Sequence, residues 1–214
     1  LASFKDGGDP CVYSRELFDM TEIEAFFEKF NAENPQNRIT LTHLCVRAVA
    51  ESLTITGRNG GVVSAGHFMP DKEIDVSVLV NIGGSNLGSV VVKDANHCSL
   101  VDISNKLFQT VSKMRKGKDE QLNDQMKLFR RIPSSIMQLL VRVIAFISYD
   151  LGLPVPAAKV TAKHFGHAIV TNVSGMEFKD AIAPLVPICK PICVVVMNQI
   201  FEKPIVVNGE VKVR

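Results

Sequence analysis

The run VSVLVNI at residues 76–82 constrains the fold of this chain most strongly, because it is almost continuously apolar. A strand with water on one face alternates apolar and polar side chains, whereas a strand covered on both faces does not. The run therefore predicts an interior strand of a sheet that is covered on both sides. We expect further strands at residues 62–70, 89–95, 167–173 and 192–201, where β-forming residues gather.

The N-terminal segment predicts a strand followed by a helix. Residues 11–18 alternate and contain several β formers, which is typical of a strand. Asp19 then provides a helix N-cap, and Glu22 stands at the spacing of a capping box. The following apolar residues recur at helical spacing and predict one apolar face: Ile23, Phe26, Phe27 and Phe30.

Further helices are expected between the strands. Thr40 is a plausible N-cap for a helix over 41–53 that is apolar almost all round and should be buried. Ser99 and Asp102 have capping-box spacing and predict a helix that runs to about Lys116. Helical patterns also cover 119–132 and 134–153. Near the C-terminal end, Asn208-Gly209 predicts a β-hairpin with a type I′ turn.

This order of elements predicts an α/β fold, a mixed sheet covered by helices, in a single domain over 1–214. Its net charge of +2 provides no strong field for nucleic acid, so we expect no nucleic-acid partner. The apolar helix at 134–153 contains Arg142 and Asp150, which a membrane span tolerates poorly. We therefore expect that helix to pack on the domain, without membrane contact.

Histidines and cysteines provide the candidate ligands for a metal. His164 and His167 precede Cys189 and Cys193 at a spacing that zinc could use, but core packing is the interpretation we favour, and no metal is expected. A cysteine nucleophile would need a nearby base, and no local pattern provides one. Cysteines in apolar surroundings favour a reducing compartment. Most of the five cysteines of the chain lie in such surroundings; the five are Cys11, Cys45, Cys98, Cys189 and Cys193.

Two other motifs resemble phosphate-binding sequences. The basic run KMRKGK (113–118) is more typical of a helix C-terminus with solvated cations. The glycine-rich NIGGSNLG (81–88) lies between two strands, so it lacks the strand-to-helix context of a nucleotide-binding loop.

The segment IVTNVSGM (169–176) is the candidate active-site segment. A Thr-Asn pair, Thr171-Asn172, ends an apolar strand and is followed at once by Ser174-Gly175. A hydroxyl at such a strand end could face a cleft and stabilise a developing oxyanion. The pattern alone favours an ordinary transition from a strand to a turn.

Five segments, in this order, resemble the catalytic domain of the 2-oxoacid dehydrogenase dihydrolipoyl acyltransferases. They are ITLTHLCVRAVAESL, IDVSVLVNIGG, VVVKDANHCSLVDIS, IVTNVSGM and IFEKPIVVNGEVKVR. The resemblance implies a chloramphenicol-acetyltransferase-like, two-layer α/β sandwich. It also implies assembly as a homotrimer or larger particle with other subunits of a 2-oxoacid dehydrogenase complex. The mitochondrial matrix, or the cytoplasm of a bacterium, would be the expected compartment.

The resemblance also implies chemistry. An acyl group would move between the thiols of dihydrolipoamide and coenzyme A, which is a substrate here, with a histidine as general base. The family's strand-end motif, like TISNLG, matches VTNVSG and gives Thr171 the role of oxyanion stabiliser, with Asn172 beside it. The family's histidine stands in an HxxxDG motif, which this sequence does not contain.

Other departures set the chain apart within the family. The stretch before KDA reads SNLGSVVV instead of a sequence like RGLVVPV, and residues 118–163 form a helical insertion. We expect the strand with the HxxxDG motif to lie beyond Arg214, which would make the protein an acyltransferase. The alternative is a non-catalytic relative with a structural or assembly role in a larger complex, and a histidine from a neighbouring subunit is a third possibility.

Overall fold

The computed structural model describes residues 11–56, 61–64, 67–83, 86–117, 133–153, 155, 165–176, 178–185 and 191–214. Its central element is a four-stranded sheet with the order β4-β3-β5-β6. The strands are β3 (Val76–Gly83), β4 (Asn86–Val92), β5 (Ala168–Asn172) and β6 (Cys193–Met197). Strand β4 is antiparallel to β3, whereas β5 is parallel to both β3 and β6. This mixed sheet confirms the predicted fold class.

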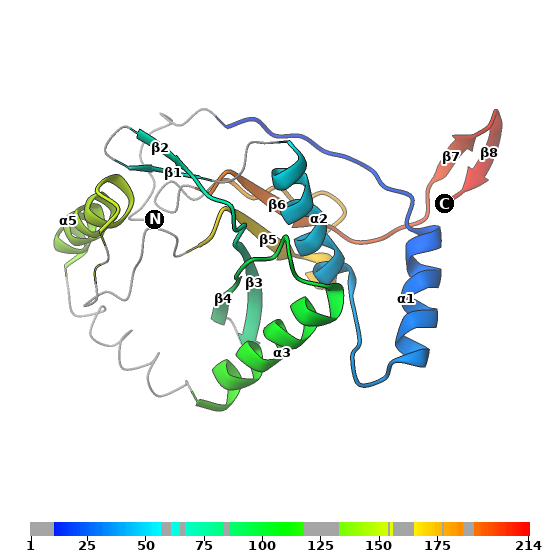
Figure 1. The fold of residues 1–214 in the computed structure, drawn as a ribbon. Helices are drawn as coiled ribbons and strands as arrows, with labels where there is room; N and C mark the ends of the chain where they lie inside the picture. The colour runs from blue at the N-terminus through cyan, green and yellow to red at the C-terminus, as the bar shows by residue number, and fades with distance from the viewer. Residues whose placement is uncertain are drawn as a thin grey trace.

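Two helices cover one face of this sheet (Figure 1). They are α2 (Leu41–Ile55) and α3 (Leu100–Gly117), and their inward side chains form one core with alternate residues of the strands. The core includes Val46 and Ala50 from α2, Ile103 from α3, and Val78 and Val170 from the sheet. The helices form one layer and the sheet the other, as a two-layer sandwich requires.

The apolar run that predicted an interior strand is buried on both faces in its first half. Val76 and Val78 face the helices and Ser77 faces the opposite side, and all three side chains have at most 1% exposure. The prediction for residues 76–82 is therefore confirmed in that half. Further along β3 the side chains become partly exposed.

Two hairpins lie outside the central sheet. Strands β1 (Gly61–Ser64) and β2 (His67–Pro70) pair with each other, as do β7 (Pro204–Val207) and β8 (Glu210–Val213). Asn208 and Gly209 join β7 to β8 with φ angles of 54° and 84°, which confirms the predicted turn with two positive φ values. Figure 1 shows this hairpin projecting from the rest of the molecule, next to α1.

The prediction of a strand at residues 11–18 is wrong. This segment pairs with no strand among the described residues, and Val12 and Phe18 are 94% and 77% exposed. Ion pairs hold the segment to distant parts of the chain instead: Arg15 pairs with Asp180 at 3.0 Å and Asp19 with Arg214 at 3.4 Å. Alternating residues form a strand only where a free sheet edge supplies hydrogen-bond partners.

The predicted helix starts are partly right. The N-cap of helix α1 (Thr21–Glu33) is Met20 and not the predicted Asp19, and it makes no side-chain cap hydrogen bond, so the predicted capping box with Glu22 does not form. The Asp19 carboxylate instead accepts hydrogen bonds from the amide and hydroxyl of Thr21. None of the residues of α1 is buried. In contrast, Ser99 and Asp102 form the predicted capping box of α3. The Ser99 hydroxyl and amide lower the pKa of Asp102.

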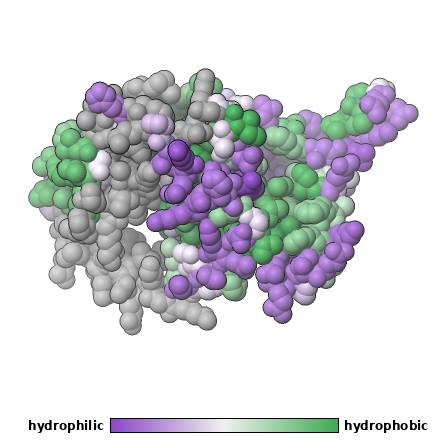
Figure 2. Space-filling model, in the orientation of Figure 1, coloured by the Kyte–Doolittle hydropathy of each residue, from purple (hydrophilic) through white to green (hydrophobic). Residues whose placement is uncertain are grey.

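The apolar stretch at 134–153 forms a shorter helix than expected. Helix α5 (Ser134–Ala145) passes into a π-helical turn, Phe146–Asp150, and the helix ends there. Figure 2 shows apolar side chains gathered over α5. No helix within the described residues is long and apolar enough to cross a membrane. The expected helix at 119–132 lies outside the described residues.

Candidate active site

Thr171 is the penultimate residue of β5, and its side chain faces away from the helices. It pairs with Leu79 of β3 and Val196 of β6, so it stands in the middle of the sheet. Its neighbour Val170 packs into the core beneath α2 and α3, and successive side chains of a strand point to opposite faces. The Thr171 side chain is half-buried on the face opposite the two helices, where a hydroxyl can meet a ligand.

Asn172 faces the other way and fixes the end of the strand. Its side-chain Nδ2 donates to the Thr42 hydroxyl at the start of α2 (3.2 Å), and its side-chain Oδ1 accepts from the backbone amide of Ser174 (2.9 Å). The Val173 amide donates to the carbonyl of Met197 (3.0 Å). The predicted site residues are therefore adjacent in sequence but lie on opposite faces of the sheet, and Asn172 is placed to position Thr171.

Replacing Asn172 with alanine is expected to lower the rate of any reaction that uses Thr171. The variant should lose only a little of its unfolding free energy. The loss of two hydrogen bonds to an exposed side chain should cost about 1 kcal/mol of unfolding free energy. Asn172→Asp keeps the acceptor for the Ser174 amide and should have a smaller effect on the rate. Urea unfolding and turnover measured on the same samples would check this, and unchanged turnover with Asn172→Ala would contradict it.

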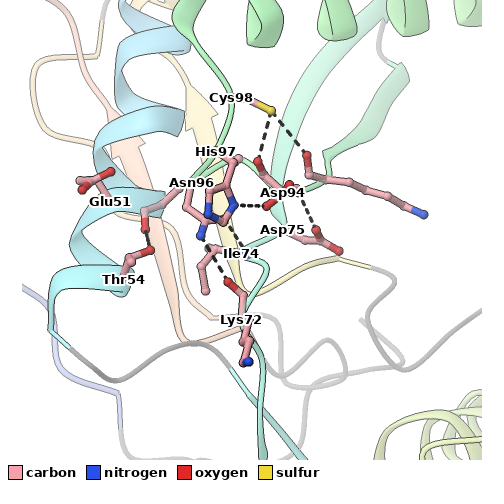
Figure 3. A network of polar contacts seen from close by, with 12 residues as sticks. Glu51, Thr54, Lys72, Ile74, Asp75, Asp94, Asn96, His97 and Cys98 are labelled. Atoms are coloured by element: carbon pink, nitrogen blue, oxygen red, sulfur yellow. Dashed lines mark hydrogen bonds and ion pairs between the residues drawn. The ribbon is translucent and has the colours of Figure 1, made fainter.

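A polar network fixes the loop between β4 and α3 to the segment that leads into β3 (Figure 3). The buried Asn96 side chain accepts from the Ile74 amide (3.0 Å) and donates to the Lys72 carbonyl (3.3 Å). The Asp94 amide donates to the Asp75 carboxylate (3.0 Å), and Asp94 has a positive φ of 55°. These bonds hold the edge strand β4 against β3, so the network is structural.

His167 is a structural residue at the start of β5. Its Nδ1 accepts a hydrogen bond from the Asp75 amide (2.9 Å), and its Nε2 lies 3.3 Å from the Asp71 carboxylate. The suggested zinc site also needs His164 and Cys189, which lie outside the described residues. Among the residues that the structure describes, no group of three or more His, Cys, Asp or Glu side chains could hold a metal.

His43 also lacks the properties of a general base. Burial lowers its pKa, so the imidazole is neutral at neutral pH. The Thr40 amide donates to its Nδ1 (3.1 Å), which leaves the proton on Nε2. His43 can therefore donate a hydrogen bond but has no free nitrogen that would accept a proton from a thiol.

The cysteine thiols near the sheet are held in their protonated form. Burial, and to a lesser extent the neighbouring Cys193, raises the pKa of Cys45 to about 11, and burial also raises the pKa of Cys193. The Cys98 thiol donates to the Asp94 carbonyl (3.2 Å), and the Lys106 ammonium donates to the Cys98 sulfur (2.9 Å). The sequence pattern gave no sign of this pair, which joins Cys98, just before α3, to Lys106 within α3.

We expect Cys45 to react slowly with iodoacetamide in the folded protein. Because its pKa is about 11 instead of the ordinary 9.0, the thiolate fraction at pH 8 should be about 100-fold lower than in the unfolded chain. The reaction rate should rise about tenfold per pH unit up to about pH 11. Mass spectrometry of alkylated peptides, with and without urea, measures this ratio. Equal rates in the two states would contradict it.

The fold is similar to that of acyltransferase catalytic cores. One similar structure is the dihydrolipoamide acetyltransferase of Azotobacter vinelandii, which was investigated for the role of a serine, a histidine and an asparagine in its catalytic mechanism. The TM-score is 0.60 and the sequence identity 17%, over 92% of this chain and 65% of that chain. A probable dihydrolipoamide acetyltransferase of Listeria monocytogenes has a TM-score of 0.57 and 13% sequence identity, over 89% of this chain and 63% of that chain. The cubic core of a pyruvate dehydrogenase multienzyme complex has a TM-score of 0.60 and 15% sequence identity, over 92% of this chain and 65% of that chain.

The sequence itself shows the family. The model of the 2-oxoacid dehydrogenases acyltransferase catalytic domain matches residues 8–126, more than half of the chain, and the chain belongs to this family. No protein with a curated description matches it. The chain spans slightly less than two thirds of the length of the three solved structures named above. The family match ends before β5, so it does not cover the candidate residues Thr171 and Asn172.

Proposed function

We propose that this protein transfers an acyl group between a dihydrolipoyl thiol and coenzyme A within a 2-oxoacid dehydrogenase complex. One observation carries the proposal: Thr171 lies near the end of the central strand β5, with its half-buried side chain on the sheet face opposite α2 and α3. Family membership supports acyl transfer as the reaction class. We also propose a homotrimer or larger assembly, because a cubic complex core has the same fold. The proposed compartment is the mitochondrial matrix or the bacterial cytoplasm.

The proposed reaction begins when a base removes the proton of the attacking thiol. The thiolate adds to the thioester carbonyl, and the Thr171 hydroxyl donates a hydrogen bond to the oxyanion that forms. The tetrahedral intermediate then collapses: the carbon–sulfur bond to the departing thiol breaks, and that thiolate takes the proton back from the base. In this proposal the base is a histidine of an HxxxDG motif, which the present sequence does not include.

The test is acetyl transfer from acetyl-CoA to dihydrolipoamide by the native protein with its natural C-terminus. Turnover that depends on a histidine of that terminus would support the proposal. Absence of turnover with every thioester tried, in a protein that is folded and carries that histidine, would overturn it.

A second candidate is a non-catalytic subunit with an assembly role, and helix α5 favours it. Several large apolar side chains of this helix and the π-helical turn are exposed: Ile136, Leu139, Val143 and Phe146. Such a surface is typical of a protein interface. Purified protein that transfers acyl groups would reject this candidate. Inactive protein that assembles through α5, and loses assembly with Leu139→Glu, would support it.

A further inference from the structure

The sheet face that carries Thr171 also carries a row of half-buried side chains across all four strands. The pairing places Ser89 of β4 opposite Leu79 of β3, Leu79 next to Thr171 of β5, and Thr171 next to Val196 of β6. All four side chains are half-buried. In the preceding row, the central residues Ser77 and Ile169 are buried, with 0% and 2% exposure. Along the two central strands, the side chains on this face therefore change from buried to half-buried at this row.

A pair of serine hydroxyls stands at one end of this row. The oxygens of Ser77 and Ser89 lie 2.5 Å apart, and neither hydroxyl has another hydrogen bond among the described residues. Each hydroxyl has one proton. One of the two protons forms the hydrogen bond between the oxygens, so the other needs a different acceptor. If Ser89 donated, the spare proton would belong to the fully buried Ser77, and an unsatisfied buried donor is costly. We infer that Ser77 donates, and that no described residue accepts the proton of the half-buried Ser89, which can therefore reach an acceptor on the sheet face.

The spacing of the two hydroxyls defines the kind of ligand. Ser89 and Thr171 lie two strands apart, which is about 10 Å between their backbones. The apolar Leu79 lies between them. A ligand that uses both hydroxyls has one acceptor oxygen at Thr171, an apolar middle portion, and a second acceptor oxygen several carbons away. An acyl thioester with an oxygen near the far end of its chain has these features, whereas an acetyl group does not.

We propose that this row binds the acyl chain and that Ser89, oriented by Ser77, selects acyl groups with a distal acceptor oxygen. The inference rests on the proposed function, because it takes the oxygen at Thr171 to be the thioester carbonyl. Leu79 contacts the methylene groups between the two oxygens. Ser89 and Leu79 are specificity-determining residues, and Ser77 is a positioning residue that acts through Ser89.

The test measures binding with analogues that cannot react, so that it does not depend on catalysis. Two pantetheine ketones, in which a methylene group replaces the thioester sulfur, carry a hexanoyl or an ω-hydroxyhexanoyl chain. Isothermal titration calorimetry with the native protein should show about fivefold tighter binding of the hydroxylated analogue, the effect of one hydrogen bond. Ser89→Ala should abolish this preference and leave the affinity for the hexanoyl analogue within about twofold.

Further variants separate selection from a general structural effect. Ser89→Thr keeps the hydroxyl and should keep the preference, whereas Ser77→Ala should weaken it although Ser89 is intact. The double variant should show no further loss beyond Ser89→Ala, because the two residues act as a unit. Ser52→Ala is the matched control: Ser52 is exposed on α2 and donates only to the Ala48 carbonyl, so its replacement should change neither affinity.

The outcomes distinguish this inference from the proposed function. Equal binding of the two analogues, or binding of neither, overturns the inference, whether or not the protein transfers acyl groups. A preference that Ser89→Ala leaves unchanged also overturns it. Preferential binding that depends on Ser89, in a protein that transfers no acyl group, supports the binding row and counts against the proposed function alone.

Discussion

Replacing Thr171 with alanine is expected to lower the turnover number for acyl transfer about 10²–10³-fold, the usual effect of losing one donor to an oxyanion. In the proposed reaction, the hydroxyl stabilises charge that exists only after the thiolate has attacked. Ground-state binding of the thioester should therefore change little, and the loss should appear in kcat and not in KM. Steady-state kinetics with the native protein and its acceptor thiol would measure both parameters.

Two replacements at the same position are the controls. Thr171→Ser keeps the hydroxyl and should retain most of the activity, whereas Thr171→Val keeps the shape and should be as inactive as alanine. Circular dichroism melts would show that all three variants fold, since Thr171 lies near the end of β5 and is only half-buried. A Thr171→Val variant with near-normal turnover would remove Thr171 from the mechanism.

Replacing Gly166 with alanine is expected to destabilise the protein by about 3 kcal/mol, the combined cost of a left-handed backbone and a steric clash. Gly166 has a φ of +65°, and an added Cβ would lie 2.5 Å from the carbonyl oxygen of Asp75. That oxygen accepts the hydrogen bond of the His167 amide (2.7 Å), which joins the start of β5 to the start of β3. The substitution should break this connection.

Gly175→Ala is the matched control for this change. Its added Cβ would meet no atom within 4 Å, and its φ is not positive, so the substitution should be nearly neutral. Urea unfolding followed by circular dichroism gives the two free energies. A Gly166→Ala protein as stable as the Gly175→Ala protein would show that the connection between Asp75 and His167 contributes little.

Local patterns predicted the elements whose causes are local. The turn at Asn208-Gly209 and the cap formed by Ser99 and Asp102 depend on residues within a few positions, and both form as expected. The strand at 11–18 was wrong because a strand also needs a partner edge, which no local pattern specifies. The π-helical turn at 146–150 is another feature that periodicity did not reveal.

The candidate site was predictable only in part. The resemblance of VTNVSG to a known motif pointed to Thr171, but it did not show that Asn172 faces α2 and bonds to Thr42. The contact between Ser77 and Ser89 depends on the register of β3 with β4, and register follows from the whole sheet. The bond from the Asp75 amide to His167 joins residues 92 positions apart, so no local signal could reveal it.

The parallel pairing of β3 with β5 has a consequence for synthesis of the protein. While the chain emerges from the ribosome, β3 can pair with β4 almost at once, but its other edge stays bare until residues 168–172 are made. During that interval α2 and α3 can pack on only half of the sheet, and an open strand edge can pair with another nascent chain. The central sheet therefore cannot be completed before residues 168–172 are made, and a chain halted before β5 should depend on chaperones.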